Sequence, residues 1–235
     1  MKDSLDRYFE VMQEAPQLFL PRVRRKLILD RKLLDEWSKT NGVNLGVLAE
    51  TPFFLFIYDL VKFDDGAPHP YSRLVSKKSL EGQNSVVILP VIRAKEGERV
   101  ILILQERHAL GKQVLEIPRG FAEPGVDELS QARNELESET GYTGTPIFLG
   151  TSYSDSGTTD NLVSFYLIRV EKKGVPHPEV TEQIERIVEM PLDAVRQHIG
   201  TDLISDGYTI QALGLYDRYL NYGSSAAASD KAPRE

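Results

Sequence analysis

The chain has 235 residues, of which 41% are hydrophobic, so it is long enough to bury a sizeable core in one large domain or in one domain with an extension. It has no cysteine, which excludes disulfides and thiolate chemistry, and its four histidines argue against a His-rich zinc site. Any metal would therefore be held by oxygen ligands, which Mg²⁺ and Mn²⁺ prefer. The formal net charge of −7 argues against nucleic acid or an anionic membrane as partner, although a bound metal ion would still let the chain take a small phosphorylated substrate.

Residues 1–48 are predicted to form a helical extension, because apolar side chains recur there at helix-like intervals. Pro16 and Pro21 divide this segment, and Asn41 with Gly42 marks its end. Its charged start lacks the apolar region of a secretory signal, and no apolar run in the chain is long enough to cross a bilayer. We therefore expect a cytoplasmic protein without membrane contact.

A basic cluster lies inside this extension, at Arg22, Arg24, Arg25 and Lys26. Two interpretations fit it. The four side chains could contact phosphate, or they could form the solvated face of a helix.

The remaining elements are predicted in the following order. Strands are indicated by β-branched and apolar runs at 53–62, 71–76, 86–92, 100–105, 114–117, 147–150, 162–170 and 188–190. Helices are indicated at 127–140, 192–198 and 208–220, whereas the tail from residue 223 has nothing to bury and is expected to be disordered. Mixed strands with interleaved helices predict an α/β or α+β sandwich.

The segment from Gly120 to Tyr142 carries the clearest sign of chemistry, because a glycine-rich turn leads directly into an acidic helix. Glu135 and Glu139 are four residues apart, so their carboxylates project from one helix face. Such a pair is either a solvated helix face or, with a cation between the two carboxylates, a site for Mg²⁺.

The same segment resembles the Nudix box, G-x5-E-x7-R-E-U-x-E-E-x-G-U, in which U is a bulky apolar residue. Without a gap, the residues that match are Gly120, Glu135, Leu136, Glu139 and Gly141, and Tyr142 supplies the final bulky residue. The resemblance implies an α/β/α sandwich with a mixed sheet, in which the box forms a loop, a helix and a loop that hold the metal.

Three positions depart from the box. Val126 replaces its first glutamate, Asn134 replaces its arginine, and Ser138 replaces the first acid of its glutamate pair. Because Ser138 removes an expected ligand, the resemblance implies one well-held metal and weaker binding of any further metal.

The flanking residues resemble the ADP-ribose pyrophosphatase and nucleotide-sugar branch of the Nudix hydrolase superfamily. The segments LQERHALGKQVLEIPRG and SDSGTTDN match its patterns, which implies Arg107, Glu116 and Asp160 as substrate-binding residues. The metal ligands implied are Glu135, Glu139, Glu116 and the carbonyl of Arg119. For the general base the resemblance leaves Glu182 and Glu179 open, and we assign the catalytic role to Glu182 beside Glu135 and Glu139.

These features predict an N-terminal extension (1–48), a Nudix domain (49–222, with its first strands at 52–78) and a tail (223–235). The expected function is Mg²⁺-dependent hydrolysis, with Mn²⁺ as a possible substitute, of the pyrophosphate bond of ADP-ribose or a nucleotide sugar, which gives a nucleoside monophosphate and a sugar phosphate. The three departures from the box favour an alternative, a weak or inactive Nudix domain that senses a nucleotide or binds a protein. A third reading is a scaffold with an accidental acidic helix. The branch also implies a homodimer that exchanges the strands of residues 53–76.

Overall fold

The computed structural model of the chain describes residues 3–63, 66–121, 123, 125–179 and 182–223. They fall into two compact units, which are considered separately. Unit 1 comprises residues 1–82 and 155–161, and unit 2 comprises residues 83–154 and 162–235. No helix in these described ranges combines the length and apolar character needed to cross a membrane.

Unit 1 combines short helices with a four-stranded antiparallel sheet. In chain order its elements are α1 (Ser4–Glu14), the 3₁₀ helix η1 (Pro16–Phe19), β1 (Arg25–Leu27), α2 (Arg31–Asn41), β2 (Gly46–Glu50), β3 (Phe54–Phe63), β4 (His69–Ser76) and α3 (Lys77–Leu80). Strand β4 lies along one edge of β3, while β1 and β2 share the other edge.

The core of unit 1 joins the N-terminal helices to this sheet. Leu5 and Tyr8 of α1 and Leu34 of α2 are buried in one apolar cluster with Leu55 and Ile57 of β3. The sequence predicts the helices and strands 52–78 in different domains, but in the structure they share this core. The basic residues Arg25 and Lys26 also differ from expectation, because β1 replaces the predicted helix there. The predicted tail lies outside the described residues from residue 224 onward.

Unit 2 is built on a seven-stranded mixed sheet. Its strands are β5 (Ser85–Ala94), β6 (Gly97–Arg107), β7 (Lys112–Glu116), β8 (Arg119–Gly120), β9 (Tyr142–Tyr153), β10 (Leu162–Lys173) and β11 (Ile184–Pro191). The main path runs β11-β6-β5-β10-β9, with β7 on β6 and β8 on β5, and β10 pairs with β5 in parallel while the other pairs are antiparallel.

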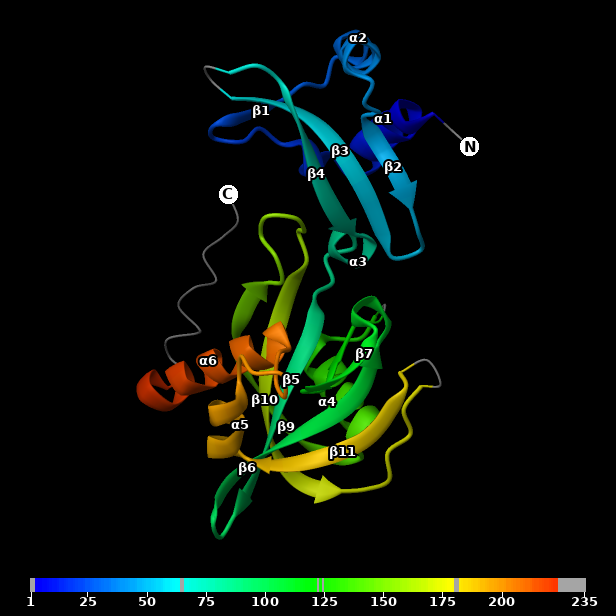
Figure 1. Cartoon of the computed structure of the whole chain (residues 1–235). Coiled ribbons are helices and arrows are strands. Elements are labelled where there is room, and N and C mark those ends of the chain that lie inside the picture. Colours follow the sequence, from blue (N-terminus) through cyan, green and yellow to red (C-terminus); the bar gives the residue numbers. More distant parts are fainter. Residues whose placement is uncertain (1–2, 64–65, 122, 124, 180–181, 224–235) are drawn as a thin grey trace. The chain divides into compact units, whose positions relative to one another are not determined.

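Helices cover both faces of this sheet (Figure 1). Helix α4 (Glu128–Thr140) packs on one face, and helices α5 (Leu192–His198) and α6 (Gly207–Tyr222) pack on the other, while the 3₁₀ helix η2 (His108–Leu110) connects β6 with β7. Side chains alternate between the two faces along β5, so this strand contributes to two cores. Val87 and Leu89 pack with α5 and α6. Val86 and Ile88 pack with Ala132 and Leu136 of α4. The predicted α/β/α sandwich with a mixed sheet is confirmed.

Candidate functional site: a carboxylate cluster beside paired arginines

Helix α4 presents its acidic face to the segment around β8. The helix begins at Asp127, whose carboxylate accepts hydrogen bonds from the N–H groups of Leu129 (3.1 Å) and Ser130 (3.0 Å). It ends at Gly141, whose φ of 75° supplies the left-handed C′ residue. Between these ends, the backbone N–H of Arg119 donates to Oε2 of Glu139 at 3.3 Å.

Three carboxylates meet at this place. Glu135, Glu139 and Glu182 each offer an oxygen, and these three oxygens lie within 4.8 Å of one another. Glu139 is only 2% exposed. Glu182 comes from the connection that precedes β11, so two distant parts of the sequence contribute to the cluster.

The cluster concentrates negative charge in a partly buried environment. Burial raises the pKa of Glu135 to about 7 and that of Glu139 to about 9, and the neighbouring Glu182 charge adds to both shifts. Burial also raises the pKa of Glu182. Within the described ranges, no arginine, lysine or histidine forms an ion pair with any of the three carboxylates. A proton or a cation is therefore needed to neutralise them, and an all-oxygen donor set fits a hard divalent cation.

Gln131 positions one member of the cluster. Its Nε2 donates to Oε1 of Glu135 at 2.7 Å from one turn earlier in α4. Gln131 is itself buried, so this amide fixes the direction of the Glu135 carboxylate. The spacing of four residues is the signal in the sequence that would have identified this contact.

A second charged group adjoins the cluster. Glu116, at the end of β7, is fully buried, and it accepts from Arg107 and from Nη2 of Arg119, the latter at 3.1 Å. Nη1 of Arg119 lies 3.4 Å from Asp206, and its guanidinium lies over the Tyr208 ring at 4.7 Å. Burial raises the pKa of Glu116, while the two arginines oppose that shift.

Arg107 joins the two groups. Besides its contact with Glu116, its charge lowers the pKa of Glu182 against the effect of burial. Its Nε–H is buried and has no hydrogen-bond acceptor among the described residues. This donor is available to an anionic ligand.

The sequence-predicted residues thus separate into groups. Glu135, Glu139 and Glu182 come together, with Arg107, Glu116 and Arg119 adjoining them. The role of Glu116 as a metal ligand stays a prediction, because its carboxylate already binds two arginines; that of the Arg119 carbonyl does too. Asp160 belongs to unit 1, where it accepts from the N–H of Ser76 at 3.1 Å, and its substrate-binding role also stays a prediction.

Ser138, which departs from the box, has a structural role in this chain. Its hydroxyl donates to the carbonyl of His177 at 3.3 Å, and its own carbonyl accepts from the His177 N–H at 2.8 Å. These contacts tie α4 to the connection between β10 and β11. The third acid of the cluster, Glu182, lies further along the same connection.

We predict that Gly120→Ala lowers activity much more than it lowers stability. A Cβ at Gly120 would lie 1.8 Å from Oε1 of Glu135, so the Glu135 carboxylate must move. That side chain is flexible enough to move without unfolding the helix. A loss of one of several ligands predicts a fall of about 10- to 100-fold in kcat/KM, with a melting temperature within a few degrees of the wild type. Steady-state kinetics and thermal unfolding test this, with the open position Gly125→Ala as control; equal activity of Gly120→Ala and the control would contradict it.

Comparisons with known proteins agree with this architecture. The model of the NUDIX domain matches residues 82–211. A methanol dehydrogenase activator from Bacillus methanolicus is 30% identical over 125 residues, which cover 52% of this chain and 68% of that protein. An ADP-ribose pyrophosphatase from Bacillus subtilis is 30% identical over 152 residues, covering 62% and 80%. The crystal structure of an ADP compounds hydrolase matches the fold with a TM-score of 0.63 at 18% identity, covering 76% of this chain and 92% of that one.

Proposed function

The chain belongs to the NUDIX domain family, and from this premise we propose that it hydrolyses the pyrophosphate bond of ADP-ribose or of a nucleotide sugar with Mg²⁺ as cofactor. Mn²⁺ is expected to substitute for Mg²⁺. The products would be a nucleoside monophosphate and a sugar phosphate. The observation that carries this proposal is the convergence of Glu135, Glu139 and Glu182 next to an arginine pair.

Glu135 and Glu139 are the residues that would hold the divalent cation, and an oxygen of Glu182 lies within 4.8 Å of theirs. Their oxygens are close enough to act on one ion, and burial, with the charge of the neighbouring carboxylates, raises the pKa values of both. When bound, such a cation stabilises the charge that develops on the diphosphate and lowers the pKa of water.

The chain's other residues supply orientation and proton transfer. Arg107 and Arg119 are held by Glu116, and their planar guanidinium groups fit the oxygens of a diphosphate. The Glu182 carboxylate lies on a loop at the cluster, is half buried and accepts the proton of the attacking water at an oxygen. Its position depends on Gln105, whose Nε2 donates to the Glu182 carbonyl.

A product assay tests the proposal. Purified protein with Mg²⁺ is incubated with ADP-ribose, with a set of nucleotide sugars and with NADH, and the products are identified by mass spectrometry. We expect a nucleoside monophosphate and a phosphorylated remainder from ADP-ribose or a nucleotide sugar, and none when EDTA replaces Mg²⁺. The proposal fails if no substrate in this set is cleaved with either Mg²⁺ or Mn²⁺.

A second candidate function is nucleotide sensing or protein binding by a domain with little catalysis. Val126, Asn134 and Ser138 favour it, since the contacts of Ser138 serve α4 and the adjoining connection. Saturable binding of ADP-ribose without product in the same assay would support this candidate over hydrolysis. A homodimer formed through residues 53–76 also stays a proposal, and a monomer at micromolar concentration by size exclusion would contradict it.

A further inference from the structure

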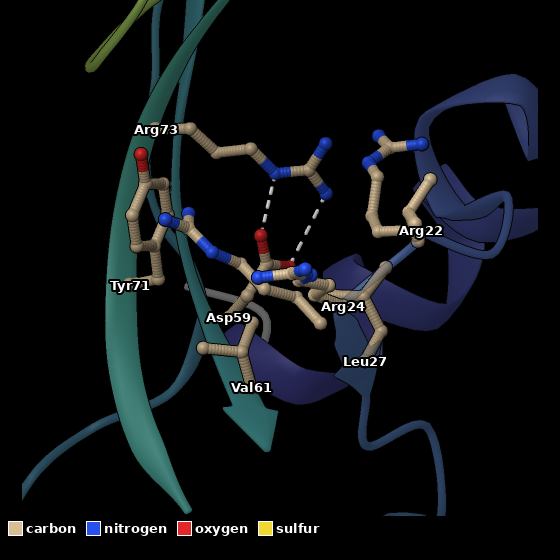
Figure 2. A pocket seen from close by; sticks show the side chains of 9 residues that line it. Arg22, Arg24, Leu27, Asp59, Val61, Tyr71 and Arg73 are labelled. Carbon is tan, nitrogen blue, oxygen red and sulfur yellow. Dashed lines mark hydrogen bonds and ion pairs between the residues drawn. The ribbon is translucent and has the colours of Figure 1, made fainter. Parts of the chain in front are cut away.

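Unit 1 contains a pocket of its own, with a volume of about 430 Å³. It lies on one face of β1, β3 and β4 and is closed by the segment that precedes β1 (Figure 2). Four of its lining residues are arginines, namely Arg22, Arg24, Arg25 and Arg73. In a chain with a net charge of −7, this concentration of positive charge is local.

Among the described residues, Arg73 is the only one of these four arginines that has a carboxylate partner. The side chain of Arg73 contacts Asp59 through Nε at 2.5 Å and Nη2 at 3.2 Å, shown as dashed lines in Figure 2, and its Nη1 donates to the Leu18 carbonyl. Asp59 also accepts from the Tyr8 hydroxyl, so it is fully engaged. For Arg22, Arg24 and Arg25, no carboxylate of the described ranges lies within 4.0 Å of a guanidinium nitrogen. The described residues that line the pocket therefore carry a net positive charge.

Two of the three remaining guanidinium groups are held in place by uncharged partners. Arg22 donates to the carbonyls of Leu20 (3.1 Å) and Leu18 (3.3 Å). Arg25 lies over the Tyr71 ring at 4.9 Å and the Phe63 ring at 5.3 Å. These contacts reduce the freedom of both side chains without cancelling their charge, which lowers the entropy cost of binding an anion.

The strand register explains why the charge gathers on one face. Arg25 is paired with Phe63 and Leu27 with Val61 across β1 and β3, and Leu27 and Val61 also line the pocket. Side chains alternate along a strand, so Lys26, between Arg25 and Leu27, points to the other face. Lys26 is not among the lining residues.

We propose that this pocket binds a diphosphate group, as inorganic pyrophosphate or as part of a nucleoside diphosphate, at a site separate from the carboxylate cluster. Three guanidinium groups that have no carboxylate partner among the described residues favour a ligand with several negative charges, and their forked donors match phosphate oxygens. The volume falls in the usual range for a small-molecule site, and Leu27 and Val61 provide an apolar wall for the uncharged part of a nucleotide. The ligand needs no metal here, because the protein supplies the positive charge.

Isothermal titration calorimetry with the full-length protein in EDTA tests this proposal. The probes are ADP, inorganic pyrophosphate and inorganic phosphate, at physiological salt. Arg22→Ala and Arg24→Ala are each expected to weaken binding of ADP or pyrophosphate by about 10-fold or more, because each removes a charged hydrogen-bond donor. Lys26→Ala removes the same charge from the same segment but from the other face, and is expected to change the affinity by less than about 2-fold.

Arg107→Ala separates this site from the proposed active site, because without metal the arginines would hold a diphosphate there. Binding in EDTA should be unchanged in that variant, and this result does not depend on whether the protein is a hydrolase. Tighter binding of ADP than of pyrophosphate would identify a nucleoside diphosphate as the ligand, and the reverse order would identify the inorganic ion. The proposal is overturned if neither ADP nor pyrophosphate binds saturably, if Lys26→Ala weakens binding as much as Arg24→Ala does, or if Arg107→Ala abolishes binding. Trp37 fluorescence on urea unfolding, which reports on the core of unit 1, verifies that unit 1 is folded in each variant.

Discussion

Replacing Glu139 by glutamine is expected to lower kcat/KM for the pyrophosphate substrate by about 10³-fold, since a catalytic metal contributes several kcal/mol of transition-state stabilisation and about 1.4 kcal/mol corresponds to a factor of ten. Glu139 is the most buried of the three clustered carboxylates, and its side chain has no neutralising partner among the described residues. Glutamine keeps the size of the side chain and removes its charge. Steady-state kinetics at saturating Mg²⁺ measures the loss.

Glu137→Gln is the matched control for this substitution. Glu137 is on the same helix two residues earlier, is exposed and points away from the cluster, so its replacement should leave kcat/KM within about 2-fold of the wild type. The thermal stability of the two variants shows whether either change disturbs the fold. Equal activity of Glu139→Gln and Glu137→Gln would exclude Glu139 from catalysis.

Metal-free protein is expected to lose stability as the pH rises, and Mg²⁺ is expected to restore it. The pKa values of Glu135 and Glu139 in the folded chain are about 7 and about 9, above the ordinary value of 4.5. Between these values the folded state binds more protons than the unfolded state does, so the unfolding free energy falls with rising pH. This contribution is fully present below pH 4.5 and is lost as the pH passes through about 7 and then about 9.

Mg²⁺ takes the place of these protons, so its effect should be greater at pH 9 than at pH 6. At a concentration 100 times its dissociation constant, it would add about 2.7 kcal/mol, or roughly 5–10 °C in melting temperature for a chain of this size. Other carboxylates titrate too, some with lowered pKa values such as Glu50 and Glu98, so the measured quantity is the difference between the wild type and Glu139→Gln. Thermal unfolding of both proteins at several pH values measures this difference. Identical melting temperatures with and without Mg²⁺ at pH 9 would contradict the assignment of the cluster.

Local patterns in the sequence predicted much of unit 2, because its elements are long and strongly periodic. Helix α4 begins one residue after the predicted start and ends at the predicted Thr140, and α5 has the predicted bounds. In unit 1 the pattern failed where pairing is not local. Strand β1 has only three residues and forms by pairing with β3, about 36 residues further on, and β2 was not predicted at all. The residues of β1 and β2 alone therefore do not predict these two strands.

The same distinction holds for the site. The i, i+4 spacing of Glu135 and Glu139 is a property of one helix, so the sequence placed these carboxylates on one face. Glu182 reaches the cluster because Ile184 of β11 pairs with Gln105 of β6. These two strands are far apart in the sequence. Glu116 accepts hydrogen bonds from both Arg107 and Arg119, and these contacts likewise depend on how β6, β7 and β8 are arranged. A family pattern pointed to these residues, but only the tertiary structure shows which of them contact one another.

The most direct test of the metal centre is the binding of Mn²⁺, followed by electron paramagnetic resonance of the free ion, in the wild type, Glu139→Gln and Glu137→Gln. We expect saturable binding by the wild type and by Glu137→Gln, with competition by Mg²⁺, and loss of that binding in Glu139→Gln. If all three proteins bind Mn²⁺ alike, or if none does, the ion is not held by the clustered carboxylates.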